Sequence, residues 1–196
     1  MDKIEIINLA LARIGVSSIE RIDEPSEAAR QTKAFYDHVR RTVLRKFPWG
    51  FATRRLELAM ISETPAAYKY AYRQPTDALF IRRLYKSGST KPWDQKHYKC
   101  VSDTSGRVIY TNEEFAEVEY TADIQDASLF DDSFIDAMSW KLAAEVAFPL
   151  TGRADLAANA VQGYNAYFTE AAGEDAAEGN EPEEYVNRLA MARFMG

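Results

Sequence analysis

The chain has 196 residues, of which 46% are hydrophobic and 12% aromatic, and this apolar content is enough to bury a core. Its formal net charge of −6 argues against a globally basic nucleic-acid-binding protein. The single cysteine, Cys100, excludes an internal disulfide framework. Acids interrupt the apolar N-terminal stretch, so we expect no signal peptide, no membrane span and synthesis in the cytoplasm.

Two helices are predicted in the N-terminal quarter of the chain. Apolar residues recur at helical spacing over residues 2–14, and Gly15 follows as a C-cap. A longer helix is expected to begin near Pro25, because proline is tolerated in the first turn, and to end at Pro48. Its basic residues are expected on the side opposite its apolar stripe. That stripe consists of Ala28, Thr32, Phe35, Val39, Val43 and Phe47.

The stretch KFPWGFATRR, residues 46–55, places three aromatic residues beside two helix breakers. A ligand-binding corner, a nucleic-acid contact and a packed turn are the three interpretations of this composition. We expect a packed turn in which Phe47, Trp49 and Phe51 hold the chain against the helices, because a tryptophan beside a helical core is more often buried than displayed. The stretch therefore predicts a junction between a helix and the region that follows.

Short runs rich in β-branched and aromatic residues come next, separated by turn signals. They predict a small, mostly antiparallel sheet. Val118 and Tyr120 alternate with Glu117 and Glu119, as expected of a strand with one face in water.

Helical periodicity resumes at Asp132, where Ser133 and Asp136 have the spacing of a capping box. Gly152 is expected to end this third helix. A fourth helix is indicated by the spacing of Ala157, Val161, Tyr164 and Phe168. After residue 172 the chain becomes acidic and rich in small residues, a composition that does not favour independent packing.

The sequence therefore predicts an α+β protein that is mainly helical. We expect a bundle of about four helices, with a small antiparallel sheet inserted between the second and third, and an extended acidic C-terminal segment. The helical bundle domain is expected to be discontinuous. The predicted boundaries are 1–51 and 131–172 for the bundle, 52–130 for the β insertion and 173–196 for a C-terminal docking arm.

Little in the sequence points to catalysis, a metal or a cofactor. The only histidines are His38 and His97, so a site built from several histidines is excluded, and a dyad of Cys100 with either one has no supporting motif. The glycines occur singly, without a phosphate-binding loop. Carboxylates are plentiful, and the obvious pairs for paired-carboxylate hydrolysis are Glu113-Glu114 and Asp131-Asp132, although adjacent carboxylates in a loop usually solvate independently. We therefore expect no enzyme activity, no metal and no cofactor.

Charge is divided unevenly along the chain. Residues 30–55 are strongly basic, whereas no lysine or arginine lies between Arg107 and Lys141. Such a division suits head-to-tail association of identical subunits, and equally suits two faces that neutralise each other within one subunit. A basic helix beside Trp49 also suits nucleic-acid binding, with Arg40, Arg41, Arg54 and Arg55 as its contacts. The subunit-interface candidates are Arg30, Arg40, Arg41, Arg54, Arg55, Glu113, Glu114, Glu117 and Glu119.

The order of these features resembles the tail tubular protein A family of short-tailed bacteriophages, the head-to-tail adaptors also called gatekeepers. The likeness covers nearly the whole chain and rests on the order and spacing of short motifs: INLALARIG, a helix containing alanine and arginine, and a Trp-x-Phe turn. The residues that carry it are Asn8, Leu11, Ala12, Ile14, Gly15, Trp49 and Phe51.

This resemblance implies a virion structural protein located at the head-to-tail interface and made in the host cytoplasm. It implies a dodecameric ring that joins the portal protein to the tail nozzle protein, with double-stranded DNA passing through the lumen without sequence recognition, and no membrane partner. It also implies portal docking by the C-terminal segment, with Tyr185, Val186, Leu189, Met191 and Phe194 as candidates. A virion-associated cell-wall or polysaccharide hydrolase and a nucleic-acid-binding module are the alternatives.

Overall fold

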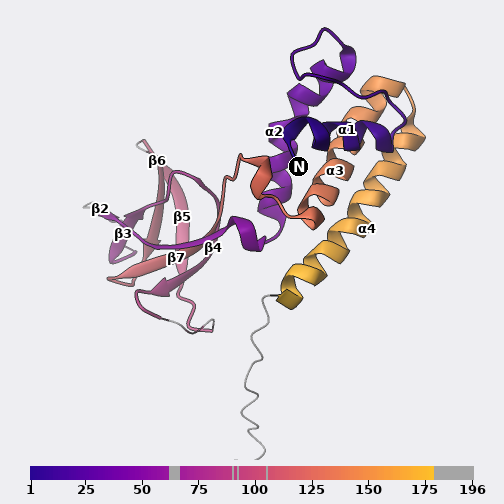
Figure 1. Cartoon of the computed structure of the whole chain (residues 1–196). Helices are drawn as coiled ribbons and strands as arrows, with labels where there is room; N and C mark the ends of the chain where they lie inside the picture. Colours follow the sequence, from indigo (N-terminus) through magenta and orange to yellow (C-terminus); the bar gives the residue numbers. More distant parts are fainter. Residues whose placement is uncertain (62–66, 90, 92, 105, 179–196) are drawn as a thin grey trace, which may run out of the picture.

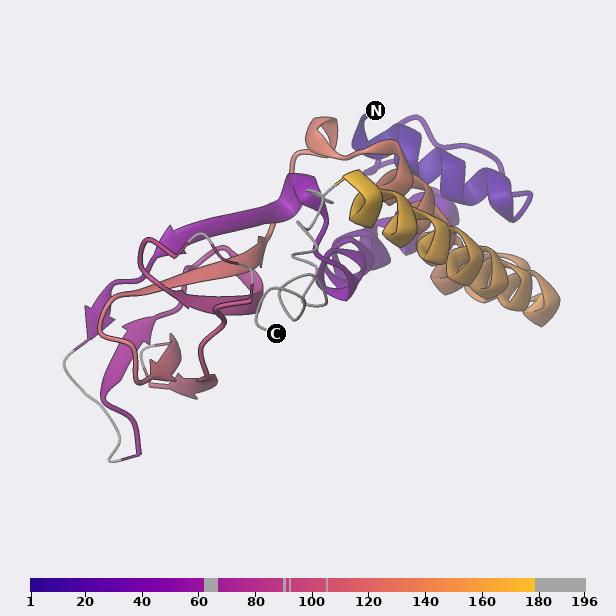
Figure 2. The same cartoon turned by 90° about the horizontal axis from the view of Figure 1, so that it is seen from below.

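The structure, a computed structural model, places the strands at one end of an elongated molecule and the helices at the other. Figure 1 shows this division, and the view from below in Figure 2 agrees with it. The predicted α+β class is confirmed, with the strands lying between the second and third helices in chain order. The structure describes residues 1–61, 67–89, 91, 93–104 and 106–178, the last ten without their side chains.

Helix α1, Lys3–Arg13, begins and ends at local sequence signals. Asp2 and Glu5 form a capping box at its start, in which the Glu5 N–H donates to the Asp2 carboxylate at 2.9 Å. Gly15 adopts φ +71° just after its end, as the sequence predicts. The N–H groups of Gly15 and Val16 then donate to carbonyls of the last turn, so the helix ends in a Schellman motif.

Helix α2, Glu27–Lys46, differs from its prediction at both its start and its buried face. Ser26 caps it by accepting from the Ala29 N–H at 3.1 Å, so Pro25 precedes the helix instead of starting it. A serine hydroxyl satisfies a free N–H of the first turn, which proline cannot do. The buried residues include Tyr36 and Arg40, the latter predicted on the solvent side.

Helices α3, Asp132–Thr151, and α4, Ala154–Glu178, complete the helical part. The N-cap of α3 is Asp131, which accepts from the Phe134 N–H at 2.6 Å; the predicted pair of Ser133 and Asp136 does not form the cap. Gly152, at φ +68°, ends α3 as expected. α3 contacts the other three helices and is buried on most sides, so it is the centre of the bundle. α4 continues through residues 173–178, which the sequence assigned to the docking arm.

The β region forms two antiparallel sheets instead of one. The sheets have the strand orders β1-β7-β4 and β2-β3-β6-β5. The chain crosses between them just after β1, because the Leu58 N–H still bonds to Ala116 of the first sheet while the Ala59 carbonyl already accepts from Arg73 of the second. The bounds are β1 Thr53–Glu57, β2 Met60–Ile61, β3 Tyr70–Arg73, β4 Ala78–Lys86, β5 Tyr98–Asp103, β6 Gly106–Thr111 and β7 Ala116–Ala122.

The predicted alternation along β7 is confirmed. Val118 and Tyr120 are buried, and Glu117 and Glu119 between them are partly exposed. The buried residues of the sheets belong to the same cluster as those of the helices. One hydrophobic core therefore runs from α3 into both sheets.

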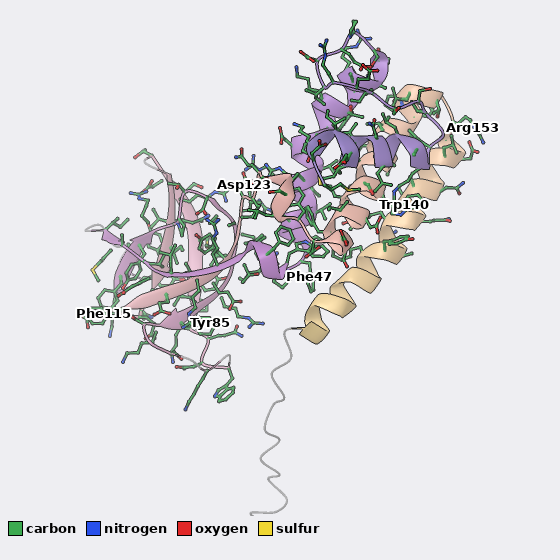
Figure 3. All side chains as sticks on the ribbon, viewed as in Figure 1. Phe47, Tyr85, Phe115, Asp123, Trp140 and Arg153 are labelled. Carbon is green, nitrogen blue, oxygen red and sulfur yellow. The ribbon has the colours of Figure 1, made fainter. Side chains whose placement is uncertain are left out.

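Trp49 lies where the helices meet the strands, between α2 and the short 3₁₀ helix Gly50–Ala52, and is fully buried. Its indole N–H donates to the Val43 carbonyl at 3.1 Å, and its ring packs edge-on against Phe47, Phe134 and Phe168 at centroid distances of 5.3, 5.3 and 6.2 Å. The prediction of a packed turn is confirmed, and Figure 3 shows the neighbouring Phe47 at this junction.

The packing of α4 on α3 depends on a glycine. A Cβ atom added at Gly163 would lie 2.6 Å from the Trp140 ring. The ring has no room to withdraw, because the Arg13 guanidinium lies over it at 4.2 Å and Tyr167 stacks on it at 6.1 Å. The missing side chain at Gly163 therefore allows the Trp140 ring of α3 to pack directly against the backbone of α4.

We expect Gly163→Ala to lower the free energy of unfolding by about 1–3 kcal/mol, the usual cost of overpacking. Glycine to alanine within a helix otherwise stabilises by about 1 kcal/mol. The same substitution in a Trp140→Ala background is therefore expected to stabilise relative to that background. Urea denaturation of the four proteins measures both effects, and stabilisation in the presence of Trp140 would contradict the contact.

Among the described residues, no helix has the length and apolar character needed to cross a membrane.

Candidate functional site

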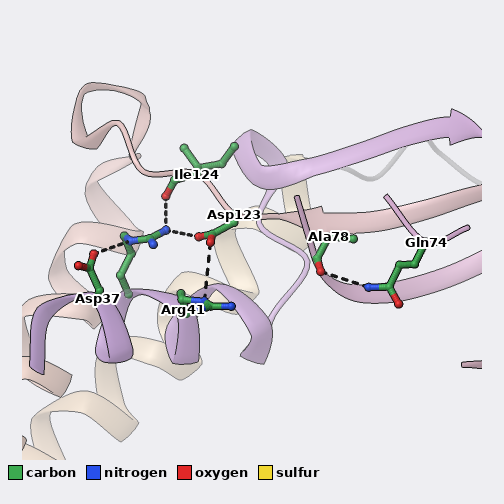
Figure 4. A network of polar contacts seen from close by, with 7 residues as sticks. Asp37, Arg41, Gln74, Ala78, Asp123 and Ile124 are labelled. Carbon is green, nitrogen blue, oxygen red and sulfur yellow. Dashed lines mark hydrogen bonds and ion pairs between the residues drawn. The ribbon is translucent and has the colours of Figure 1, made fainter. Parts of the chain in front are cut away.

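Two arginines, one buried and one partly exposed, join the helical part to the strands. The first is Arg40 of α2, whose side chain is 3% exposed. Its guanidinium donates to the Asp123 carboxylate at 2.5 Å and to the Ile124 carbonyl at 2.6 Å, in the connection that follows β7 (Figure 4). Asp37 and Arg41 lie at the edge of this network, at 3.6 Å from Arg40 and 3.7 Å from Asp123. Arg40 was predicted to face solvent, and the structure instead uses it as an internal anchor.

The second anchor is Arg82 of β4. Its guanidinium donates to the backbone carbonyls of Arg45 and Phe47 at 2.8 Å each, and its Nε–H donates to the Thr121 hydroxyl at 2.8 Å. Burial lowers the pKa of Arg82 from its ordinary value, although a guanidinium stays charged. The carbonyls at the C-terminal end of α2 lack partners within the helix, so a cation from the sheet satisfies them. No sequence signal indicated this role for Arg82.

We expect Arg82→Met to lower the free energy of unfolding by about 1.5–3 kcal/mol, because it removes the charge-assisted hydrogen bonds to the carbonyls at the end of α2. Arg83→Met is the matched control, since Arg83 is the next residue on the same strand, is 44% exposed, and makes a 3.8 Å ion pair with Glu119 and a hydrogen bond with the Tyr85 side chain. The control is expected to change stability by less than about 1 kcal/mol. Thermal denaturation followed by circular dichroism compares them, and equal losses would contradict the anchor role.

Most of the other interface candidates find partners inside the subunit. Arg54 pairs with Asp77 at 2.6 Å, and Arg55 pairs with Glu117 at 2.7 Å. Arg30 pairs with Glu27 in the first turn of α2, and Glu119 with Arg83. Of these pairs, Arg55 with Glu117 joins the basic stretch to the acidic stretch, as expected if the two charged faces neutralise each other within one subunit. Glu113 and Glu114 differ, because their carboxylates make no ion pair within the described part of the chain.

An arginine-lined groove lies between the C-terminal half of α2, β4 and the β5–β6 hairpin. Its larger part has a volume of about 540 Å³, and a contiguous part of about 380 Å³ shares Arg45, Gln74, Leu79 and Arg107 with it. The smaller part adds Arg41, and no aspartate or glutamate is among the lining residues of either. The remaining lining residues are Pro75, Thr76, Ala78, Phe80, Ile81, Tyr98, Cys100, Val101, Ser102 and Gly106.

The groove offers two cations without carboxylate partners. Neither Arg45 nor Arg107 forms a salt bridge over the residues that the structure describes. Arg45 lies 5.8 Å from the ring centre of Phe80, whose side chain is 42% exposed, and Gln74 donates to the Ala78 carbonyl on the floor of the groove (Figure 4). The groove therefore combines positive charge with an aromatic surface. The sequence placed Arg45 in a basic stretch but gave no reason to bring it together with Arg107.

The two acidic pairs lie at a helix cap and on a turn. The Asp131 carboxylate caps α3, and Glu113 and Glu114 lie on the turn between β6 and β7. A general acid needs a raised pKa. Every described carboxylate whose pKa departs clearly from its ordinary value has it lowered by hydrogen bonds, and these are Glu24, Glu27, Asp94, Glu117, Asp126 and Asp155. The hydrolase alternative gains no support from them.

The predicted absence of a reactive Cys–His dyad concerns His97 and Cys100. His97 stacks on Tyr68 with the two rings nearly parallel. Desolvation raises the pKa of the Cys100 thiol, which disfavours a reactive thiolate. Within the described residues, no group of three or more histidine, cysteine or acidic side chains is placed to hold a metal ion. The portal-docking candidates Tyr185, Val186, Leu189, Met191 and Phe194 lie outside the described residues.

Comparisons with known proteins add no family. A scan against models of protein families found no match to this chain, and a search of curated proteins found none either. The likeness to phage adaptors described above therefore stays a prediction, and the function has to be argued from residues and geometry.

Proposed function

We propose that this chain is a subunit of a head-to-tail adaptor ring in a short-tailed phage virion, joining the portal to the tail nozzle and acting through protein–protein contacts. The observation that carries the proposal is the exposure of large apolar side chains at both ends of a body that shares one core. Trp93 is 74% exposed and Phe115 56% among the strands, and Phe148 is 58% exposed on α3. Aromatic side chains are enriched at protein interfaces, and a subunit held between two partners needs contact surfaces at both ends.

The residues behind the resemblance support the proposal because each has a defined place in the fold. The Asn8 side chain donates to the Ile19 carbonyl at 2.9 Å and accepts from the Ile19 N–H at 2.8 Å, so it holds the loop that follows α1. Gly15 ends α1, and Trp49 is the centre of the junction. These residues therefore lie where α1 is joined to α2 and where the strands begin. The likeness to the phage adaptors rests on the order and spacing of the same segments.

The two arginine anchors are a further support. Arg40 and Arg82 fix α2 to the strands on two sides, so contacts made by either end of the subunit are held at a constant relative orientation. A ring around passing DNA requires such constancy from every subunit. A net charge of −6 is also compatible with a DNA channel that repels the phosphate backbone.

Mass photometry of the chain with and without its cognate portal protein tests the proposal. We expect a monomer alone and a multi-subunit ring, a dodecamer by resemblance, on the portal. A double variant, Tyr185→Ala with Phe194→Ala, removes two predicted docking contacts and is expected to stay monomeric in the same mixture. A monomer that ignores the portal, or a ring that forms without it, would each contradict this form of the proposal.

A further inference from the structure

The arginine-lined groove has the chemistry of a site for an acidic segment that also carries an aromatic side chain. Arg45 and Arg107 bring two cations that have no carboxylate partner among the described residues, while the exposed Phe80 and the nearly buried Leu79 and Ile81 supply apolar lining beside them. Unpaired arginines favour carboxylates or phosphates, which they bind through paired hydrogen bonds. Peptide is favoured over phosphate alone because the apolar lining would be left uncovered by an inorganic or sugar-phosphate anion.

A matching segment exists in the chain itself, on the turn between β6 and β7. This turn displays Glu113 and Glu114, which make no ion pair in the part of the chain described, followed by Phe115, which is 56% exposed. Figure 3 shows Phe115 on the side of the strands remote from the helices. Two carboxylates followed by an aromatic ring complement two guanidinium groups beside an apolar floor.

The backbone of this turn is held in place. The hydroxyl of Tyr72, a residue only 1% exposed, donates to the carbonyls of Glu113 and Glu114. The Asn112 side chain accepts from the Lys69 N–H at 3.1 Å, and the Phe115 carbonyl accepts from the Ser87 N–H at 2.7 Å. A segment already fixed in one conformation loses little conformational entropy on binding.

Arg107 and the turn lie at opposite ends of β6. Arg107 is the second residue of the strand, and Glu113 follows its last residue, Thr111, by two positions. An extended strand rises roughly 3.3 Å per residue, so Gly106 and Thr111 are separated by about 17 Å along it. The groove extends along β5 to Tyr98, opposite Thr111, but its arginines lie at the other end. Glu113 and Glu114 of a subunit therefore lie far from its own Arg107, and a second copy is the partner that the chain supplies.

We propose that the turn formed by residues 112–115 of one copy docks in the arginine-lined groove of the next, with Glu113 and Glu114 facing Arg45 and Arg107 and Phe115 on the apolar floor. This contact is heterologous, so repeating it produces a closed ring or an open filament. It rests on the proposed function in one respect, since it supplies the contact between neighbouring subunits of the adaptor ring. It deepens that function by naming the residues on both sides.

Cys100 allows a direct test because it lines the groove and is the only cysteine in the chain. In the Glu114→Cys variant, each copy carries one thiol in the groove and one on the turn. When the variant is bound to its portal, oxidation with diamide at pH 9, chosen because desolvation raises the pKa of the Cys100 thiol, is expected to link three or more copies covalently. Peptide mapping should find the disulfide between position 100 of one copy and position 114 of another. The wild-type chain, with one thiol, stops at dimers.

Charge reversals decide whether the contact is specific. Arg45→Glu with Arg107→Glu, in the Glu114→Cys background, is expected to reduce the yield of the 100-to-114 disulfide at least about tenfold, because like charges then face each other. Glu113→Arg added to Arg107→Glu is expected to restore part of it. Arg21→Glu is the matched control, because Arg21 is exposed and lies far from the groove in sequence. Equal yields from all variants would overturn the proposal.

The test is run on the concentrated free chain and on the chain bound to its portal, which separates the two proposals. A ring on the portal without the 100-to-114 disulfide would overturn the contact and leave the adaptor function standing. If the disulfide forms in the free chain but the portal does not recruit the chain, the contact stands and the adaptor function is overturned. Salt-dependent binding of duplex DNA that Arg45→Glu abolishes, with no disulfide in either sample, would assign the groove to nucleic acid and overturn the proposal.

Discussion

Replacing Trp49 with alanine is expected to lower the free energy of unfolding by about 3–5 kcal/mol, the range seen when a large buried aromatic side chain is truncated. The indole is fully buried and packs against aromatic rings from three segments: Phe47 after α2, Phe134 on α3 and Phe168 on α4. The surrounding helices cannot close on the cavity without moving the start of β1. Urea denaturation followed by far-UV circular dichroism measures the loss, since Trp93 and Trp140 remain and would confuse a fluorescence signal.

Trp49→Phe separates packing from hydrogen bonding. It keeps an aromatic ring at the junction and removes the N–H that donates to the Val43 carbonyl, so we expect a loss of about 1–2 kcal/mol. Phe148→Ala is an exposed aromatic control, since Phe148 is 58% exposed on α3, and should cost less. A Trp49→Ala loss of under about 1 kcal/mol would show that the junction does not depend on this side chain.

Asp123→Ala is expected to cost about 3–5 kcal/mol for a different reason. It leaves the guanidinium of Arg40, 3% exposed, with the Ile124 carbonyl and a distant Asp37 as its remaining acceptors. Removing one partner of a buried ion pair is costly because the other charge stays buried without compensation. Equilibrium urea denaturation at pH 7 measures the effect.

A double-mutant cycle shows whether the cost comes from the stranded charge. Arg40→Met combined with Asp123→Ala removes both charges, so the double variant is expected to be more stable than the sum of the two single losses predicts. Asp37→Ala is the control, because this carboxylate is 70% exposed and should change stability by less than about 1 kcal/mol. Additive single losses would contradict a coupled buried pair.

The parts of the fold that the sequence predicted correctly depend on local chemistry. Gly15 and Gly152 mark helix ends because the backbone just after each helix turns left-handed, a conformation that glycine adopts without strain. Val118 and Tyr120 were placed on the buried face of β7 because side chains alternate along a strand. Where a prediction was wrong at this level, as at Pro25, a neighbouring residue offered better cap chemistry, and Ser26 took the position.

The candidate site was much less predictable. Arg41 was named from the charge pattern, but Arg107 joins it and Arg45 only because the β5–β6 hairpin lies beside α2. The anchors also depend on contacts between distant segments. The guanidinium of Arg40, for example, donates to Asp123, a residue 83 positions later in the chain. From the sequence alone, a charged residue on a helix is expected to face solvent. The sequence does not show which distant residue forms an ion pair with it.

By itself, the sequence determined the α+β class, the order of the helices and strands, the glycines that end α1 and α3, and the burial of Trp49. The tertiary structure alone decided that the strands divide into two sheets, that Arg40 and Arg82 act inside the molecule, and that Arg45 and Arg107 share a groove without carboxylates. The physical reason is the range of the interactions. Periodicity and capping act over about four residues along the chain, whereas ion pairs, strand pairing and grooves depend on which distant segments the core brings together.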